Sequence, residues 1–281
     1  MSTNEPGRRA GTIGRGVAVV TGAASGIGRE TARALRSAGF TVIGTSRRAA
    51  AADQVEGVEL RDLDVTDDAS VTALIDQVVT EFGRIDVLVN NAGIGLTAAA
   101  EESSVGQAGR IFDLNVLGVI RMTNAVLPHM RAAGHGRIIT VSSVLGLIPA
   151  PYMAVYAATK HAVEGYSESL DHEVREFGIR ALLVEPGYTR TSFEANNLAG
   201  DAPIEVYAAR RAVAQQVLAD AMHTADEPSI VAKVIVDVAT AGSPPVRTAA
   251  GRTARSVSIL RRLVPARAFD GQIRKLNRLP R

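Results

Sequence analysis

The stretch "VAVVTGAASGIG" (residues 17–28) decides the fold of this chain of 281 residues. It joins a run of apolar residues, which predicts a buried strand, to a turn with glycines at positions 22, 26 and 28. The helical pattern "GRETARALRSAG" (28–39) follows at once. A strand, a glycine-rich turn and a helix in direct succession are typical of the first half of a βαβ unit. Glycines occur in many such turns, but here they would also let a pyrophosphate approach the backbone and the helix N-terminus.

The same alternation of short apolar runs and longer helical patterns continues along most of the chain. Strands are predicted at residues 17–22, 41–46, 58–65, 85–93, 137–143, 179–187 and 244–251. Helices are predicted at 28–39, 67–83, 111–130, 153–177 and 228–242, with partial helix in 188–226. Strands that alternate with helices in this way form parallel sheets. We therefore expect an α/β fold: a single doubly wound, Rossmann-type parallel sheet with helices on both faces.

The chain divides into three parts. Residues 1–14 are polar and glycine-rich and predict a flexible tail without the apolar core of a secretory signal. Residues 15–250 form the predicted dinucleotide-binding catalytic domain, and 251–281 a basic helical extension. From Val246 to Arg281 there are nine arginines and one lysine against a single acid, Asp270. A solvated surface, contact with an anionic membrane surface and contact with an acidic substrate group all remain open for this extension.

Composition excludes several classes of site. The chain has no cysteine, so disulfides, thiolate metal sites and cysteine nucleophiles are excluded. Its histidines show no ligand spacing, and we expect no metal site. The arginines are not interleaved with aromatic residues that would stack on bases, so no nucleic-acid partner is expected. No apolar run reaches the roughly 18 residues that a membrane-spanning helix needs, and a cytoplasmic location is expected.

The segment after the second predicted strand bears on the choice of cofactor. It reads Ser46, Arg47, Arg48, and no acid follows until Asp53. An acid at this position would bind the ribose 2′-hydroxyl of NAD, whereas a guanidinium binds the 2′-phosphate of NADP. We therefore expect a preference for NADP(H). NAD(H) stays open as an alternative, because the two arginines could simply be solvated.

Four polar side chains lie at or near the carboxyl ends of the predicted strands. In "VYAATKHAVEGY" (155–166), Tyr156 and Lys160 are four residues apart and therefore share one helix face. Ser143 ends the fifth predicted strand, and Asn115 lies in the helix before it. Ligands of doubly wound sheets bind at these strand ends. A lone tyrosine and lysine at this spacing are more often structural, so the combination carries the argument.

A set of short motifs in a fixed order narrows the class of protein. They are T-G-x-x-x-G-x-G at 21–28, N-N-A-G at 90–93, Ser143, Y-x-x-x-K at 156–160 and P-G at 186–187. Over about residues 15–242 the chain resembles the short-chain dehydrogenase/reductase family of the approximately 250-residue type. Its extension resembles, more weakly, the steroid- or retinol-dehydrogenase-like members. Many NADP-dependent members carry a basic residue where this chain has Ser25, so only Arg47 and Arg48 favour NADP.

The resemblance implies both catalytic and cofactor-binding residues. It implies a catalytic tetrad of Asn115, Ser143, Tyr156 and Lys160. It implies cofactor binding by Gly22, Ser25, Gly26, Ile27, Gly28, Arg47, Arg48, Asp64, Val65, Asn91, Ala92, Gly93, Tyr156, Lys160, Pro186, Gly187, Thr189 and Thr191. Homodimers or homotetramers are common in the family.

The implied reaction interconverts a ketone or aldehyde and an alcohol, with NADP(H) carrying the hydride. Tyr156 would be the general acid and base, and Lys160 together with the oxidised nicotinamide would lower its pKa from about 10. Ser143 would hold the substrate oxygen, and Asn115 would support a water that links Lys160 to solvent. The apolar segment 144–153 favours a hydrophobic small-molecule substrate. Alternatives are an NAD(H)-dependent alcohol dehydrogenase of the same family, a nicotinamide-retaining epimerase or dehydratase, and a non-catalytic nucleotide sensor on the same fold.

Overall fold

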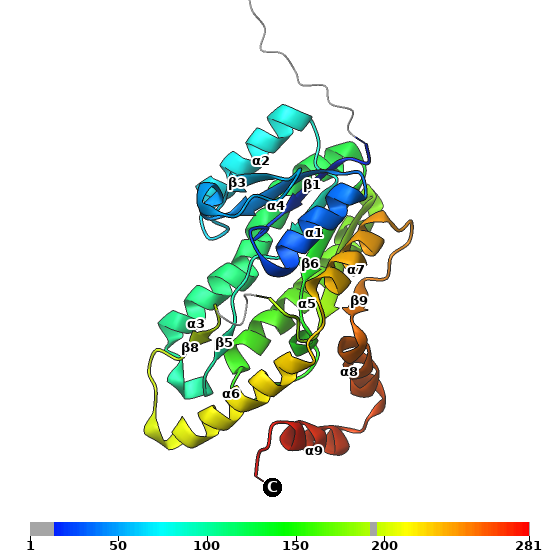
Figure 1. Cartoon of the computed structure of the whole chain (residues 1–281). Helices are drawn as coiled ribbons and strands as arrows, with labels where there is room; N and C mark the ends of the chain where they lie inside the picture. Colours follow the sequence, from blue (N-terminus) through cyan, green and yellow to red (C-terminus); the bar gives the residue numbers. More distant parts are fainter. Residues whose placement is uncertain (1–13, 192–195, 281) are drawn as a thin grey trace, which may run out of the picture.

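The computed structural model of the chain describes residues 14–191 and 196–280. Its centre is a seven-stranded parallel sheet in the order β3-β2-β1-β4-β6-β7-β9 (Figure 1). These strands are β1 Val17–Val20, β2 Thr41–Ser46, β3 Glu59–Asp62, β4 Val87–Asn90, β6 Gly136–Val141, β7 Ile179–Pro186 and β9 Arg247–Ala250. A second, parallel pair joins β5 Leu96–Thr97 to β8 Leu198–Ala199. The expected doubly wound sheet is confirmed, because the order runs outward in both directions from β1 and β4.

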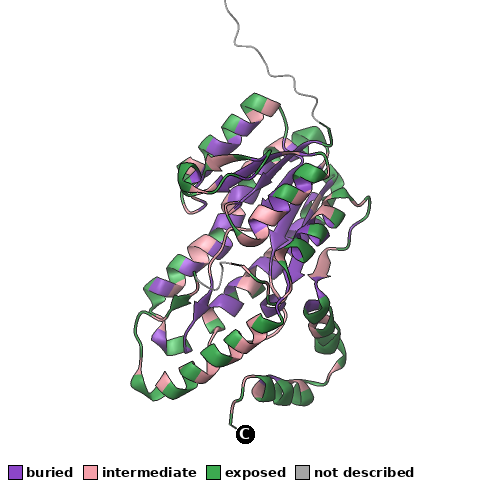
Figure 2. Cartoon of the chain, in the orientation of Figure 1, coloured by how far each residue is buried: buried purple, intermediate pink, exposed green. Residues whose placement is uncertain are grey.

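Helices cover both faces of the sheet (Figure 1). The helices of the described residues are α1 Gly26–Ser37, α2 Asp68–Phe82, α3 Val105–Phe112, α4 Gly118–Ala133, α5 Ala154–Val174, α6 Ala208–His223, α7 Pro228–Thr240, α8 Arg252–Leu263 and α9 Ala266–Leu276, of which α1, α2, α4, α5 and α7 pack on the sheet. One core cluster packs α1 and α7 on the sheet, and the other packs α2, α4 and α5 on the opposite face. Along β1, Ala18 and Val20 belong to the first cluster, while Val17 and Val19 belong to the second. Because both faces are covered, the strand is apolar throughout and lies in the buried layer of Figure 2.

The local signals place most element ends within a few residues. The Asp67 carboxylate accepts a hydrogen bond from the Ala69 N–H at 2.9 Å and begins α2, and Gly83 ends it in the left-handed region at φ +73°. The predicted helix 111–130 is instead two helices, α3 and α4, joined by the π-helical turn Asp113–Leu117. The predicted flexible tail lies outside the described residues except for Gly14.

The continuous helical stretch Val105–Ala133 is long and apolar enough, by length and composition alone, to cross a membrane. Its apolar composition has a different explanation in this fold. Met122, Val126 and Met130 are fully buried in the core cluster between the sheet and α2. The stretch is therefore accounted for as a core helix, and it does not establish a membrane-spanning segment.

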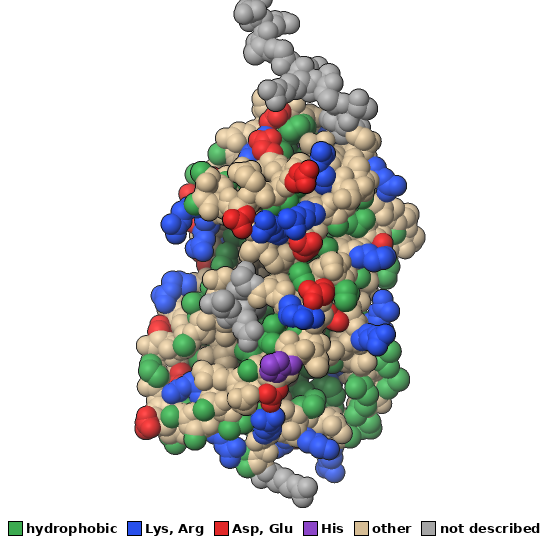
Figure 3. Space-filling model, in the orientation of Figure 1, with side chains coloured by type: hydrophobic (Ala, Val, Ile, Leu, Met, Phe, Trp, Pro, Cys, Tyr) green, Lys and Arg blue, Asp and Glu red, His purple; other side chains and the backbone are tan. Residues whose placement is uncertain are grey.

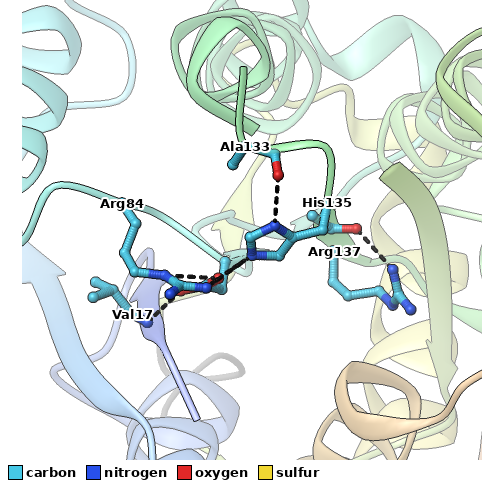
Figure 4. Close-up of polar contacts among 7 residues, drawn as sticks. Val17, Arg84, Ala133, His135 and Arg137 are labelled. Atoms are coloured by element: carbon cyan, nitrogen blue, oxygen red, sulfur yellow. Dashed lines mark hydrogen bonds and ion pairs between the residues drawn. The ribbon is translucent and has the colours of Figure 1, made fainter. Parts of the chain in front are cut away.

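The amino edge of the sheet carries a buried carboxylate, Asp86, just before β4. It accepts hydrogen bonds from the Val17 N–H at 2.7 Å and from Arg84 Nε at 2.8 Å, and His135 Nε2 also contacts it (Figure 4). A side chain at Gly16 would collide with this carboxylate, since a Cβ there would lie 2.3 Å from Oδ2. Burial acts to raise the pKa of Asp86, but the hydrogen bonds from Arg84, Val17 and His135 outweigh it and hold the pKa below its usual value. The cluster ties the starts of β1 and β4 together.

Candidate active site

A cleft of about 700 Å³ opens at the carboxyl edge of the sheet. Of the residues that the sequence implicates, those lining it are Gly22, Ser25, Gly26, Ile27, Arg47, Asp64, Val65, Asn91, Ala92, Gly93, Ser143, Tyr156, Lys160, Pro186, Gly187, Thr189 and Thr191. They come from the ends of β1, β2, β4, β6 and β7, from the segment after β3, and from α5. Gly28, Arg48 and Asn115 do not line the cleft. The fold thus brings nearly all of the implicated residues to one place.

The glycine turn after β1 forms one wall of the cleft. Gly22 and Gly26 lie in the left-handed region, at φ +65° and +54°, which residues with side chains rarely adopt. Gly28 is required for packing, because a Cβ there would lie 2.2 Å from the Gly22 carbonyl oxygen and 2.4 Å from Asn91 Nδ2. The turn therefore leaves its backbone uncovered toward the cleft at the N-terminus of α1. That arrangement fits a pyrophosphate group.

The N-N-A-G motif after β4 holds this turn in place through hydrogen bonds. The Asn91 side chain donates to the Thr21 carbonyl at 2.8 Å and to the Gly22 carbonyl at 3.2 Å. The Asn91 and Ala92 N–H groups donate to Thr21 Oγ1 at 2.9 and 3.0 Å. The motif after β4 thus fixes the loop after β1. Sequence reasoning did not assign this supporting role to Thr21.

The two arginines after β2 have different surroundings. Both are exposed, but Arg47 lines the cleft, together with Thr45 and Ser46, whereas Arg48 begins a short 3-10 turn outside it. Asp53, the first acid after β2, forms an ion pair with Arg29 at 3.4 Å. One guanidinium, rather than two, is therefore placed beside the region that a nucleotide ribose would enter.

Three of the four implied catalytic residues, Ser143, Tyr156 and Lys160, line the cleft. The fourth, Asn115, lies beneath them and is hydrogen-bonded to α5. The Tyr156 side chain is buried and hydrogen-bonded to Ser143. Lys160 Nζ donates to the Val141 carbonyl at 2.9 Å and lies 5.7 Å from the centre of the Tyr156 ring. Asn115 lies in the π-helical turn beneath the cleft, where its side chain exchanges hydrogen bonds with the Ile94 N–H at 3.0 Å and carbonyl at 2.9 Å. Such turns interrupt α-helices frequently at functional sites.

Burial has the largest effect on the pKa values of Tyr156 and Lys160, the two implied catalytic residues on α5. It raises the pKa of Tyr156, and the hydrogen bond to Ser143 opposes the shift without cancelling it. Burial also lowers the pKa of Lys160 to about 8, against an opposing attraction from Glu164. The predicted lowering of the Tyr156 pKa by Lys160 together with the oxidised nicotinamide stays a prediction, because among the protein groups by themselves burial has the largest effect. In a desolvated site the loss of hydration outweighs an ammonium that is engaged with a backbone carbonyl.

The site can now be compared with known proteins. A family model described as short chain dehydrogenase matches residues 16–202. The chain belongs to the short-chain dehydrogenase family. It is thus an NAD(P)-dependent oxidoreductase, and the predicted family is confirmed. Solved relatives include complexes with NADP and with NAD, so a nicotinamide cofactor follows from the family, without a decision between the two.

Three relatives illustrate the match. The chain is 42% identical over 180 residues to 3-ketodihydrosphingosine reductase of Bacteroides thetaiotaomicron, an alignment that spans 64% of this chain and 66% of the relative. A short-chain dehydrogenase structure from Streptomyces avermitilis is 36% identical, with a TM-score of 0.80 over 93% of this chain and 97% of that one. The 3-ketoacyl-(acyl-carrier-protein) reductase of Brucella melitensis, complexed with NADH, is 26% identical, with a TM-score of 0.72 over 84% and 96%.

The outer wall of the cleft could not be assigned from the sequence. Leu218 and Met222 on α6 line it, as do Met153, Tyr188 and Leu198. The segment that carries most of them shows little periodicity, because α6 has no buried residue to impose one. Within residues 14–191 and 196–280, no group of three or more His, Asp or Glu side chains could hold a metal ion.

Proposed function

We propose that this short-chain dehydrogenase interconverts an apolar ketone and its alcohol, with NADP(H) as the preferred cofactor and Tyr156 as the general acid and base. The observation that carries the proposal is the meeting of Tyr156, Ser143 and Lys160 in the cleft that the glycine turn also lines. A positioned acid within hydrogen-bond reach is what protonation of a carbonyl oxygen requires. An NAD(H)-dependent dehydrogenase is the alternative, and Arg47 in the cleft favours NADP(H) over it.

The proposed role of each residue follows from its position in the cleft. The glycine turn and Arg47 would hold the dinucleotide, which supplies or accepts the hydride when bound. Ser143, hydrogen-bonded to Tyr156, would hold the substrate oxygen at the phenol, which donates or accepts the proton. Lys160 carries a positive charge at neutral pH, since its pKa of about 8 lies above 7, and it would favour the phenolate. Asn115 holds the loop after β4 against α5 through Ile94 and Thr159.

The apolar residues that line the cleft bear on the class of substrate. Val144, Leu145, Met153, Leu218 and Met222 give the cleft an apolar side next to Ser143 and Tyr156. The Bacteroides relative, named 3-ketodihydrosphingosine reductase, acts on a 3-keto substrate by its name. Both observations favour a ketone with an apolar chain over a small polar one.

The proposal is tested by mixing the purified protein with NADPH or NADH and a series of ketones of increasing chain length, and following the loss of reduced cofactor by absorbance. We expect turnover that rises with chain length and is faster with NADPH. Turnover with NADH alone would select the alternative. Cofactor binding without turnover on any member of the series would instead support a nucleotide sensor.

The basic extension is proposed to contact an anionic membrane surface. The side chains of Ile259, Leu260 and Leu263 on α8 are exposed, and Arg261 and Arg262 lie between them in the sequence. Apolar and basic side chains meet at the lower right of Figure 3, where Figure 1 shows α8. Arg261 Nε donates to the Leu147 carbonyl at 3.2 Å, which attaches α8 to the segment that follows Ser143. Two copies joined through this face would bring like charges together, whereas apolar side chains flanked by arginines suit an interface with acidic lipids. We also propose a cytoplasmic enzyme that assembles as a homodimer or homotetramer, as the family resemblance implies.

Vesicle sedimentation tests the membrane contact. The protein should bind phosphatidylserine-containing vesicles, bind phosphatidylcholine vesicles weakly, and dissociate as salt rises, because exposed charges are screened. The double change Ile259→Ser with Leu263→Ser should reduce binding at least several-fold. Val105→Ser, at an exposed apolar residue on α3, is the control. Equal binding by both variants contradicts the proposal, and a smaller assembly for the double variant would identify a subunit interface instead.

A further inference from the structure

A cluster of buried charges lies behind the Tyr156–Lys160 pair. Glu164 on α5 and Glu185 on β7 are each 2% exposed. Arg247 on β9 pairs through Nη1 with Glu164 at 2.7 Å and with Glu185 at 3.4 Å, and through Nε with Glu168 at 2.6 Å. Glu168 is half-exposed, so the cluster runs from the surface toward the cleft. The motifs of the sequence include none of these four residues.

Glu164 is the member of the cluster nearest to the catalytic lysine along the helix. Glu164 and Lys160 are four residues apart on α5 and therefore share one helix face. Lys160 Nζ is bound to the carbonyl of Val141, and Glu164 lies against the next residue, Ser142, and against Gly146. A Cβ at Gly146 would lie 2.7 Å from Glu164 Cγ and 2.9 Å from Ser142 Oγ. The ammonium and the carboxylate thus support the same connection, which carries Ser143.

A buried group of charges of this kind is an inefficient means of stabilising the folded state. Burial raises the pKa of Glu164, and burial together with repulsion from Glu164 raises that of Glu185 to about 7. One guanidinium serves three carboxylates, and well-packed apolar side chains would often be as stable as such a buried group. The charged groups that face Glu164 are Lys160 and Glu168 on α5, Glu185 on β7 and Arg247 on β9, and Arg262 on α8 also acts on Glu185. The chain places these carboxylates on the side of Lys160, the lysine that lines the cleft.

We propose that Glu164 is a positioning residue for Lys160. Its carboxylate, held in place by Arg247, is the buried countercharge that keeps the lysine ammonium protonated and directed at the end of β6, behind Tyr156. The electrostatic coupling concerns this chain alone. Its consequence for turnover rests on the proposed function.

The coupling can be measured directly because the chain has only three lysines, Lys160, Lys233 and Lys275. Protein labelled with ¹³C-lysine gives three side-chain signals, which Lys233→Arg and Lys275→Arg variants assign. Titration of the Lys160 signal yields its midpoint. Glu164→Gln should lower that midpoint by about one pH unit, since an ammonium that loses a nearby opposite charge is less favoured.

Glu168→Gln is the matched control, because it removes the other α5 carboxylate that Arg247 binds but leaves Glu164 in place. Its Lys160 midpoint should equal that of the parent. Glu164→Asp, which keeps the charge and withdraws it by one carbon, should lower the midpoint by less than Glu164→Gln does. This variant also keeps the test usable if Glu164→Gln fails to fold. A Lys160 midpoint that does not move in either Glu164 variant overturns the proposal, as does an equal shift in Glu168→Gln.

Enzyme assays separate the coupling from its consequence. With an active ketone, the alkaline limb of the pH profile of kcat/KM should move to lower pH in Glu164→Gln and stay in place in Glu168→Gln. If the parent turns over no ketone, the proposed function fails, and the titration still decides the coupling. If the Lys160 midpoint shifts but the alkaline limb of the pH profile does not move, Glu164 affects only the charge of the lysine. Its proposed part in turnover is then overturned.

Discussion

The two edges of the sheet hold buried charges of opposite character. At the amino edge, Asp86 receives hydrogen bonds from Arg84, His135 and a backbone N–H, and these keep its pKa low despite burial. At the carboxyl edge, burial prevails: the pKa of Lys160 falls to about 8 and that of Glu185 rises to about 7. In each case the direction of the pKa shift depends on whether the hydrogen-bond donors outweigh the loss of hydration on burial.

The difference separates stabilising charges from reactive ones. A carboxylate with a lowered pKa contributes to folding at neutral pH, because the folded state favours its charged form. Groups whose pKa values are moved toward neutrality gain the capacity to exchange protons and give up part of that stabilisation. On this view, a change at the carboxyl edge should affect turnover, and a change at the amino edge should affect unfolding. Two substitutions, Tyr156→Phe and Asp86→Ala, test the division.

Tyr156→Phe should have the largest effect. It removes the acidic hydroxyl and keeps the ring, so turnover should fall by roughly 10²–10⁴-fold, the usual contribution of general acid–base catalysis. Cofactor affinity by calorimetry and the urea midpoint of unfolding should barely change. Near-normal turnover of the variant on a ketone that the parent reduces would remove Tyr156 from the acid–base role.

Asp86→Ala should show the opposite pattern. It leaves the Val17 N–H and Arg84 without their carboxylate, at a cost of about 3 kcal/mol in the free energy of unfolding at pH 7. Turnover of the folded variant should stay within about twofold of the parent, because the change lies at the edge opposite the cleft. Urea unfolding measures the loss, and Asp76→Ala, on the exposed side of α2, is the control.

The pH dependence of this loss has a definite sign. The pKa of Asp86 is lower in the folded than in the unfolded state, so its contribution is full above the unfolded value of about 4. It disappears as the pH falls through the folded value. The difference in unfolding free energy between parent and Asp86→Ala should therefore narrow below about pH 4. A constant difference across that range would show that the carboxylate charge is not what stabilises the amino edge.

The same contrast explains what the sequence could predict. Strand β2 and the ends of α2 were predictable because apolar runs, Asp67 and Gly83 act locally. The ion cluster of Glu164, Glu185 and Arg247 joins segments far apart in the chain and leaves no spacing pattern. The rise of the Tyr156 pKa on burial could not be predicted for a related reason. Helix spacing shows that a lysine is near, but not that its ammonium is held by a backbone carbonyl in a desolvated site.

The smallest expected effect concerns Arg47, which lies at the carboxyl edge but outside the buried cluster. A charge-assisted contact with a 2′-phosphate contributes about 1.5–3 kcal/mol, or roughly a 10–100-fold preference for NADPH over NADH. Since Arg47 lines the cleft and Arg48 does not, Arg47→Ala should remove most of the preference and Arg48→Ala little of it. The double variant should then resemble Arg47→Ala, and the further change Ser46→Asp should favour NADH. Raising salt should weaken binding of NADPH more than that of NADH, because an exposed contact is screened. Calorimetric affinities for both cofactors decide the matter, and equal binding of NADH and NADPH by the parent would mean that Arg47 is simply solvated.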